Sequence, residues 1–496
     1  MKKLWTSAAP LILSLIVLTS WASKHVVAQE RPNILWIFVD DQSRHYGFNG
    51  ESLVDTPTMD RLAAEGTLFT NTVVTAPVCS TSRSSLITGM CQTSIGAHHH
   101  RSGRGTEKIR LPDHIRMIPE YLKEAGYFTS LGTATTAATS TAARRLGKSD
   151  YNFEWSEDVY DSSDWSGREP GQPFFAQVML LGGKARPQAR KSNKIPHVNV
   201  DDVVLPPYYP DHPVIREDWA AYLDTFTLVD REVEAIVDRL AKDGDLENTI
   251  IFFLTDHGVS HARGKQYCTD EGIMVPFFVY GPGRIDAGIE RDEMVAHIDV
   301  AASTLFFAGL SIPDYMEART LFGPDASPRD YVVSARDRCD ETYDRIRSVR
   351  TQTVKYIRNG YPERPHLLPN VYKDQKEIYQ ALREWHRAGK LNDLQETLLF
   401  SKTRPEEELY DLENDPWELN NLADSAEYQP QLREMSQLLD QWIEETGDQG
   451  QNVEPMEMYD SDMAVYLQSM TSKKPERLPL IQKNIDQMKR WWREGK

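Results

Sequence analysis

A cysteine stands among small hydroxyl residues in Cys79-Ser80-Thr81-Ser82-Arg83, and the apolar pair Leu86-Ile87 follows shortly after. Small neighbours leave the thiol sterically open, and the apolar pair begins a helical pattern. If that helix begins near Ser80, the cysteine lies at its positive end, where anions are favoured. A free thiol in that place would ionise readily and act as a nucleophile. The segment is equally compatible with a buried structural cysteine beside a helix cap.

Acidic residues follow two apolar runs that are typical of central strands buried on both faces. The runs are Ile34–Val39, which is followed by Asp40-Asp41, and Thr249–Thr255, which is followed by Asp256-His257. Neighbouring carboxylates at the end of a buried strand repel each other and lose hydration, and a hard cation would remove that penalty. Because ligands bind at the carboxyl ends of strands in open α/β sheets, these acids are candidate metal ligands. Solvated strand-end acids are the alternative.

Three lysines stand in segments between the predicted elements. Lys148 follows a Thr/Ala-rich stretch, Lys184 follows the apolar run 173–180, and Lys265 follows Arg263-Gly264. The glycine lets the backbone turn, so that Lys265 can point back toward the predicted metal site. Solvated loop lysines without a binding role are the alternative for these positions.

Two further segments are dense in groups that could recognise an anionic substrate. The first, His98-His99-His100-Arg101, could bind an anionic sugar, form a surface loop or hold an adventitious metal ion. The second, Arg336 to Glu341, could line a substrate pocket or form a salt-bridged surface. From these segments we take His99, His100 and Arg336 as candidate substrate-binding residues, together with Lys184.

Length and charge limit the class of protein. The chain has 496 residues, with 56 Lys and Arg against 74 Asp and Glu, for a net charge of −18. This length predicts one large domain and a smaller one. An acidic surface argues against nucleic acid as a partner, because phosphate binding needs a basic surface. The four cysteines, Cys79, Cys91, Cys268 and Cys339, are too few for a disulfide framework, and their spacing defines no pairing.

The first residues are typical of a secretory signal. Lys2-Lys3 precede the apolar run Leu11–Leu18, which is too short for a usual membrane span, and Val26-Val27-Ala28 is a plausible cleavage site. We therefore expect residues 1–28 to be removed. The mature protein, beginning near Gln29, is then expected to be periplasmic or secreted, with no stable membrane span. An uncleaved membrane anchor is the alternative.

Periodicity predicts several other elements. Helical spacing predicts a long helix at about Arg216–Lys242 and an amphipathic helix within Lys474–Lys496. Alternation in Val354–Arg358 is typical of an edge strand. The low-complexity stretch Gly132–Ala143 predicts a flexible insertion.

The Cys79–Arg83 segment, with Leu86-Ile87-Thr88-Gly89 after it, resembles the signature of the type I sulfatases, whose cysteine is oxidised to formylglycine. The resemblance covers about Arg31 to Ala423 and looks nearest to heparan N-sulfatases and bacterial polysaccharide sulfatases. The matching residues, in the family's order, are Asp40-Asp41, Cys79, Lys148, Asp256-His257 and Lys265. Three positions depart from the family: Thr81 replaces Pro or Ala, and Asp150 and Lys184 stand where histidines are frequent.

The resemblance implies an α/β fold of the alkaline-phosphatase type, with a mixed central sheet between helices and a smaller C-terminal α+β region. It implies a catalytic domain over residues 29–340 and a C-terminal subdomain with a helical tail over residues 341–496. It also implies that a maturation enzyme converts Cys79 to formylglycine, and that one Ca²⁺ ion binds per chain. The implied residues are Cys79, Arg83, Lys148, Lys265 and His257 for catalysis, and Asp40, Asp41, Cys79, Asp256 and His257 for the metal.

Together these features predict a secreted hydrolase of sulfate esters, or of N-sulfates, on a sulfated saccharide. Two alternatives remain open. One is a phosphonate or phosphate ester hydrolase of the same superfamily, which parallel turnover of aryl sulfate and aryl phosphate would distinguish. The other is a non-catalytic protein that binds sulfated glycans, which the departures at Thr81 and Lys184 leave open. The leaving-group acid is also open, with His261, Lys184 and the His98 cluster as candidates.

Overall fold

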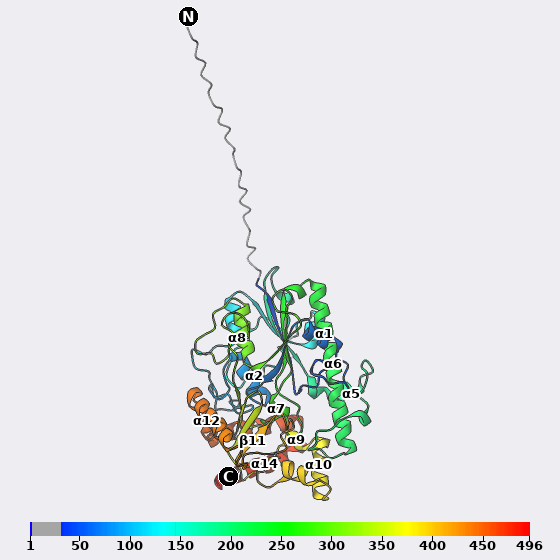
Figure 1. The fold of residues 1–496 in the computed structure, drawn as a ribbon, viewed down its shortest axis with the longest axis vertical. Coiled ribbons are helices and arrows are strands. Elements are labelled where there is room, and N and C mark those ends of the chain that lie inside the picture. Colours follow the sequence, from blue (N-terminus) through cyan, green and yellow to red (C-terminus); the bar gives the residue numbers. More distant parts are fainter. Residues whose placement is uncertain (2–30, 144) are drawn as a thin grey trace.

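The computed structural model describes residue 1 and residues 31–143 and 145–496 (Figure 1). The predicted signal peptide, apart from its first residue, and the expected cleavage site lie outside the described residues. Within the described part of the chain, no helix is both long enough and apolar enough to cross a membrane.

A seven-stranded mixed sheet forms the centre of the large domain. Its order is β3 (Phe128–Thr133), β4 (Phe174–Leu180), β1 (Asn33–Val39), β5 (Thr249–Thr255), β6 (Phe277–Tyr280), β2 (Thr67–Val73) and β7 (Ile289–Ala296). Strands β3, β4, β1 and β5 run parallel, and β6 is antiparallel to both β5 and β2. The prediction of a mixed α/β fold is therefore confirmed.

Helices cover both faces of this sheet, which explains why β1 is apolar at every position after Asn33. Alternate residues of a strand point to opposite faces. Leu35, Ile37 and Val39 join one core with α1 (Pro57–Ala64) and the long helix α6 (Pro213–Asp243). Trp36 and Phe38 join the other core with α2 (Cys79–Thr88), α3 (Ile118–Glu124) and α8 (Asp299–Phe307). Figure 1 shows these two layers on either side of the sheet.

A smaller antiparallel sheet lies in the C-terminal part of the chain. Its order is β11 (Glu407–Asp411), β10 (Val354–Asn359), β9 (Ile346–Arg350) and β8 (Val332–Arg336), and α12 (Gln429–Thr446) packs against it. Helices α13 (Met456–Lys473) and α14 (Leu478–Arg493) share a small core with Tyr343. Since β8 precedes residue 341, the small sheet draws strands from both sides of the boundary expected from the sequence.

The Thr/Ala-rich stretch is ordered in part, so the prediction of a flexible insertion over residues 132–143 is wrong for its first half. β3 runs to Thr133, and helix α4 (Ala134–Thr139) follows at once. The Thr133 side chain accepts a hydrogen bond from the Thr136 amide and so caps the helix. Ala137 is buried, and its carbonyl accepts from Arg239 of α6. Small side chains allow this close packing on α6, which low sequence complexity does not reveal.

Candidate active site

The ends of two neighbouring parallel strands bring the predicted carboxylates together. Val39 of β1 pairs with Thr255 of β5, so the two chains leave the sheet side by side. The amide of Asp256 donates to the carbonyl of Val39 at 2.9 Å, and the amide of Asp41 donates to Asp256 Oδ1 at 3.0 Å. The apolar runs indicate where each strand ends, and the pairing of β1 with β5 brings the two ends together.

The helix predicted near Ser80 is present and begins at Cys79, so the cysteine occupies its first turn. Three hydroxyl side chains bond back to carbonyls four residues earlier, from Ser84, Ser85 and Thr88. These bonds satisfy polar side chains in a helix that is buried along its whole length. Gly89 ends the helix in the left-handed conformation, with φ of 67°.

The Cys79 thiol is only 3% exposed and lies in a ring of cationic groups. Its Sγ is 2.8 Å from Lys265 Nζ, 3.5 Å from Lys184 Nζ and 3.1 Å from His257 Nε2. Burial alone would raise the pKa of the thiol, but the charges of Lys148, Lys184 and Lys265 hold that pKa well below its ordinary value. The position therefore favours a negatively charged group.

The three carboxylates behind the thiol are fully buried and share these cations. Asp40 accepts from Lys148 Nζ at 3.1 Å, from Lys184 Nζ at 2.7 Å and from Arg83. Arg83 Nη2 also donates to Asp256 Oδ2 at 3.1 Å. Despite these contacts, burial and the neighbouring charge of Asp40 raise the pKa of Asp256 to about 7. One carboxylate of the group is therefore incompletely compensated by protein cations.

This donor set fits a hard divalent cation. Candidate ligand atoms of Asp41, Cys79 and His257 lie within 4.8 Å of one another, and the same holds for Asp40, Cys79 and Asp256. Carboxylate oxygens dominate the set, which suits Ca²⁺ better than soft-ligand metals. Burial and the neighbouring charges of Asp40 and Cys79 raise the pKa of Asp256, and a bound cation would offset this cost of its negative charge.

Exposure distinguishes the three lysines of the site. The side chains of Lys148 and Lys184 are 32% and 27% exposed, whereas Lys265 is 4% exposed. Lys148 and Lys184 therefore border the opening of the site, and Lys265 lies in its interior. Asp150, which stands where a histidine is frequent in the resembling family, lies 3.7 Å from Lys148 and pairs with Arg104.

The histidine segment is mostly buried. His100 Nδ1 lies 2.6 Å from Ser80 Oγ, next to the cysteine, whereas His99 Nδ1 accepts from the backbone amide of Arg338 at 3.2 Å. Arg336 is 2% exposed and pairs with Asp344. The structure thus brings His100 beside the site, but it holds His99 and Arg336 in contacts within the protein. Arg336 and Arg338 of this segment form ion pairs that are buried and do not lie at the surface.

His261, the remaining candidate for the leaving-group acid, lies away from Cys79. His261 is fully buried, where it contacts Asp218 and lies 3.0 Å from Arg186 Nη2. No contact joins it to Cys79 in the described structure. Lys184 and the His98 segment remain the candidates near the thiol.

Sequence reasoning missed Tyr372, which reaches the site from α9 (Val371–Asp374). Its hydroxyl donates to Asp41 Oδ2 at 3.0 Å, and its ring lies 5.0 Å from Lys265 Nζ. Tyr372 is 331 positions from Asp41 in the chain, and no pattern around it indicates a site. Only tertiary structure reveals that the C-terminal part contributes to this centre.

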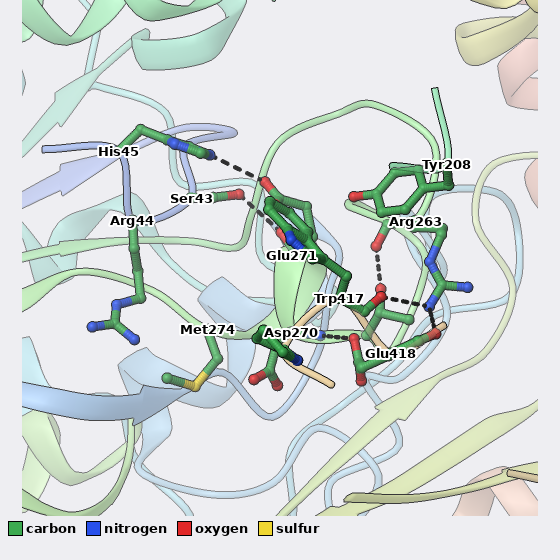
Figure 2. Close-up of a pocket in the computed structure, with 12 residues that line it drawn as sticks. Ser43, Arg44, His45, Tyr208, Arg263, Asp270, Glu271, Met274, Trp417 and Glu418 are labelled. Carbon is green, nitrogen blue, oxygen red and sulfur yellow. Dashed lines mark hydrogen bonds and ion pairs between the residues drawn. The ribbon is translucent and has the colours of Figure 1, made fainter. Parts of the chain in front are cut away.

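A separate cavity of about 240 Å³ lies beside the loop that follows Asp41, between Ser43–His45 and α7 (Asp270–Ile273). Figure 2 shows its lining, in which Arg263 donates to the carbonyl of Glu418 and the Glu418 carboxylate accepts from the amide of Asp270. None of the predicted site residues lines this cavity. It lies where the loop after β11 packs on the large domain.

Comparisons with known proteins point in one direction. The family model described as Sulfatase matches residues 32–310. An ulvan-active sulfatase of Formosa agariphila is 31% identical over 466 residues, covering 84% of this chain and 76% of the relative. N-acetylgalactosamine-6-sulfatase of Homo sapiens is 26% identical and covers 58% of this chain and 64% of the relative.

Solved structures share the fold at low sequence identity. A 2-O GAG sulfatase aligns with a TM-score of 0.62 at 18% identity, covering 86% of this chain and 94% of that one. The phosphonate monoester hydrolase of Agrobacterium radiobacter aligns with a TM-score of 0.59 at 16% identity, covering 84% and 96%. Both likenesses concern the fold alone.

Proposed function

Because this chain belongs to the sulfatase family and is a sulfuric ester hydrolase, we propose that it removes sulfate from a sulfated saccharide through a formylglycine derived from Cys79. The observation that carries the proposal is the cationic surrounding of Cys79, with Lys265 Nζ at 2.8 Å and Lys184 Nζ at 3.5 Å from its sulfur. Such an arrangement favours the negative charge that develops on sulfate oxygens. The ulvan-active relatives support a polysaccharide as the source of the sulfate ester.

The residues around position 79 would have different parts in the reaction. Formylglycine, once hydrated, supplies a hydroxyl nucleophile for sulfur. Lys265, Lys148 and Arg83 stabilise charge on the sulfate oxygens, and the buried position of Lys265 keeps its ammonium group fixed. Lys184 borders the opening and lies near both Asp40 and Cys79, so it is the better placed of the remaining candidates to serve the departing oxygen.

We propose Ca²⁺ as the metal, held by Asp40, Asp41, Asp256 and His257 together with the modified residue 79. When bound, the cation would orient sulfate oxygens and lower the pKa of the nucleophile. The oxygen-rich donor set and the raised pKa of Asp256 support this proposal.

Export and maturation complete the proposal. The charged and apolar N-terminal residues favour a signal peptide, so we propose a periplasmic or secreted enzyme. A formylglycine-generating enzyme would be its partner during synthesis. The net charge of −18 is unfavourable for nucleic acid binding.

One experiment tests the nucleophile and the substrate class together. The protein is produced with and without a formylglycine-generating enzyme, the peptide containing Cys79 is weighed by mass spectrometry, and turnover of 4-nitrophenyl sulfate and 4-nitrophenyl phosphate is measured in parallel. We expect sulfate turnover only in the converted protein and none in a folded Cys79→Ala variant. Equal turnover by the alanine variant would refute the nucleophile, and faster phosphate turnover would favour the phosphonate or phosphate hydrolase that shares the fold.

A further inference from the structure

The segment His98–Arg101 is buried except at its last residue. His98, His99 and His100 are 8%, 6% and 3% exposed, so all three belong to the interior. The side chain of Arg101, which follows directly, is 44% exposed. The segment therefore presents one cation to solvent, next to three buried histidines.

Arg101 is held in an unfavourable backbone conformation. Its φ is 59°, in the left-handed region that side chains with a Cβ rarely adopt. Its amide lies 3.1 Å from both Ser80 Oγ and Asn152 Oδ1, and so donates to acceptors on two other segments. Non-glycine residues remain in this conformation only where the surroundings enforce it, and such positions cluster at functional sites. Since Ser80 follows Cys79, one of the residues that enforce this conformation is a direct neighbour of the nucleophile.

A buried carboxylate orients the arginine side chain. Asp340 Oδ1 accepts from Arg101 Nη1 at 3.3 Å, and the Asp340 side chain is 7% exposed. Asp340 also has a positive φ, of 50°. Its neighbour Cys339 forms an isolated parallel β-bridge with His100. In the described part of the chain Nη1 is the one side-chain nitrogen of Arg101 with a bonding partner. The rest of the guanidinium fork is free to donate.

The backbone of Arg101 lies beside the active site, because its amide donates to Ser80 Oγ, next to Cys79. The charge of Asp340, followed by those of Asp150 and Cys79, raises the pKa of Arg101. Asp150 itself lies 3.7 Å from Lys148, one of the partly exposed lysines of the site. Arg101 does not contact Cys79, whose sulfur is already surrounded by Lys184 and Lys265. Arg101 is therefore not one of the cations that contact the sulfur of Cys79.

We propose that Arg101 is a specificity residue, which binds a second anionic group of the substrate beside the sulfate that is removed. A planar guanidinium with free donors matches a carboxylate or a sulfate in a two-bond geometry. The substrate would therefore be an acidic saccharide that carries either a uronate carboxylate or a further sulfate near the scissile ester. This inference rests on the proposed sulfatase function and adds the charge pattern of the substrate to it.

The test compares substrates with one and with two anionic groups. The enzyme with converted Cys79 is assayed on 4-nitrophenyl sulfate and on three sets of sulfated oligosaccharides: with a neighbouring uronate, with that uronate reduced to the alcohol, and with a second sulfate instead. We expect wild-type protein to favour the second anion. In Arg101→Gln the ratio of kcat/KM between the favoured oligosaccharide and 4-nitrophenyl sulfate should fall about tenfold to a hundredfold, chiefly through KM. If the preference is lost when the uronate is reduced, the second anionic group is a carboxylate. If the preference is kept with a second sulfate, Arg101 also accepts a sulfate.

Two variants serve as controls. Arg101→Lys keeps the charge but loses the planar fork, so its ratio should lie between those of wild type and Arg101→Gln. Arg110→Gln removes an arginine that is 80% exposed and pairs with Glu154, and its ratio should equal that of wild type. An equal loss in Arg110→Gln would show a general effect of surface charge and would overturn the proposal.

Binding gives a second measurement that does not need turnover. Calorimetric titration of the same oligosaccharides into Cys79→Ala and into Cys79→Ala with Arg101→Gln should show weaker binding in the double variant, for the sets with two anions. Equal affinities, or no preference of the first protein for a second anion, would overturn the role of Arg101. A protein that shows the Arg101-dependent affinity but no sulfate turnover would refute the proposed catalysis and leave this binding role standing.

Discussion

Lys265 and Lys184 both reach the Cys79 sulfur, but they differ in how firmly the protein holds them. Lys265 is 4% exposed and donates to Asp41 Oδ1 at 3.1 Å, whereas the Lys184 side chain is 27% exposed. Coulomb attraction to Asp41 and Cys79 outweighs burial and raises the pKa of Lys265. A fixed and charged ammonium group is the kind of donor that lowers a barrier without reorganisation.

Lys265→Ala should therefore lower kcat/KM on 4-nitrophenyl sulfate by about a hundredfold or more, because losing one preorganised donor costs about 2.7–4 kcal/mol of barrier. Bound calcium, measured by atomic emission, should stay unchanged. Lys402→Ala, at an exposed position, is the control and should keep the wild-type rate. A near-wild-type rate for Lys265→Ala would exclude this lysine from the sulfate site.

Metal removal tests the carboxylates without mutating them. Asp40 is bonded to Arg83, Lys148 and Lys184, so replacing it would leave three cations uncompensated and confuse the result. Dialysis against a chelator should abolish turnover and lower the melting temperature, because a ligand that binds only the folded state stabilises it. Calcium should restore both. Full turnover by protein shown to be metal-free would rule out a catalytic cation.

At the scale of elements, helix α2 depends on how it ends. Gly89 has φ of 67°, and its amide donates to Ser85 O. A Cβ added there would lie 2.7 Å from Met316 Sδ. Position 89 therefore needs glycine for two reasons, its left-handed backbone conformation and the close approach of Met316.

Gly89→Ala should destabilise the protein by at least the cost of a left-handed residue, about 1–2 kcal/mol. Gly447→Ala is the matched control, since Gly447 has φ of 60° at the end of α12 but no atom within 4 Å of the place that a Cβ would take. Urea denaturation of both variants measures the two effects, and the difference between them reports the contact with Met316. Equal losses would show that the methionine yields without cost.

The same elements show what the sequence could and could not predict. The runs 34–39 and 249–255 are largely apolar, so the strand ends that carry Asp40 and Asp256 could be located directly. The burial of His99 and Arg336 could not be predicted. Polar side chains give the same sequence pattern whether they pair in the interior or face water. Tyr372 is a common residue type in an ordinary segment, and its role follows only from a contact across 331 positions.

At the scale of the whole molecule, Glu341 joins several parts of the C-terminal region. Its Oε1 accepts from the amide of Val371 at 2.6 Å and from Asn484 Nδ2 at 3.0 Å, while Oε2 has no partner in the described structure. Burial, with the charge of Asp340, raises the pKa of Glu341 to about 7. The folded state thus keeps a proton that the unfolded state releases near pH 4.5, and stability falls as the pH rises from there to about 7.

Glu341→Gln should remove this pH-dependent loss. Relative to wild type, the variant should gain up to about 3 kcal/mol of unfolding free energy at pH 8, and change little at pH 5, where Glu341 is protonated when folded. Urea denaturation at the two pH values measures the difference. A variant that is equally affected at both would show that Glu341 does not titrate near neutrality.

The burial of the nucleophile has a consequence for the order of events in the cell. Cys79 is 3% exposed, in the first turn of a helix that is buried along its whole length, and Tyr372 of the C-terminal part lies beside the same centre. No enzyme could seat this thiol in its own active site after folding. On the proposed function, oxidation of Cys79 must therefore precede folding, so incubating folded protein with the maturation enzyme should leave the mass of the Cys79 peptide unchanged, whereas a synthetic peptide of the same segment should be converted. The time between synthesis and folding then sets the fraction of molecules that can ever become active.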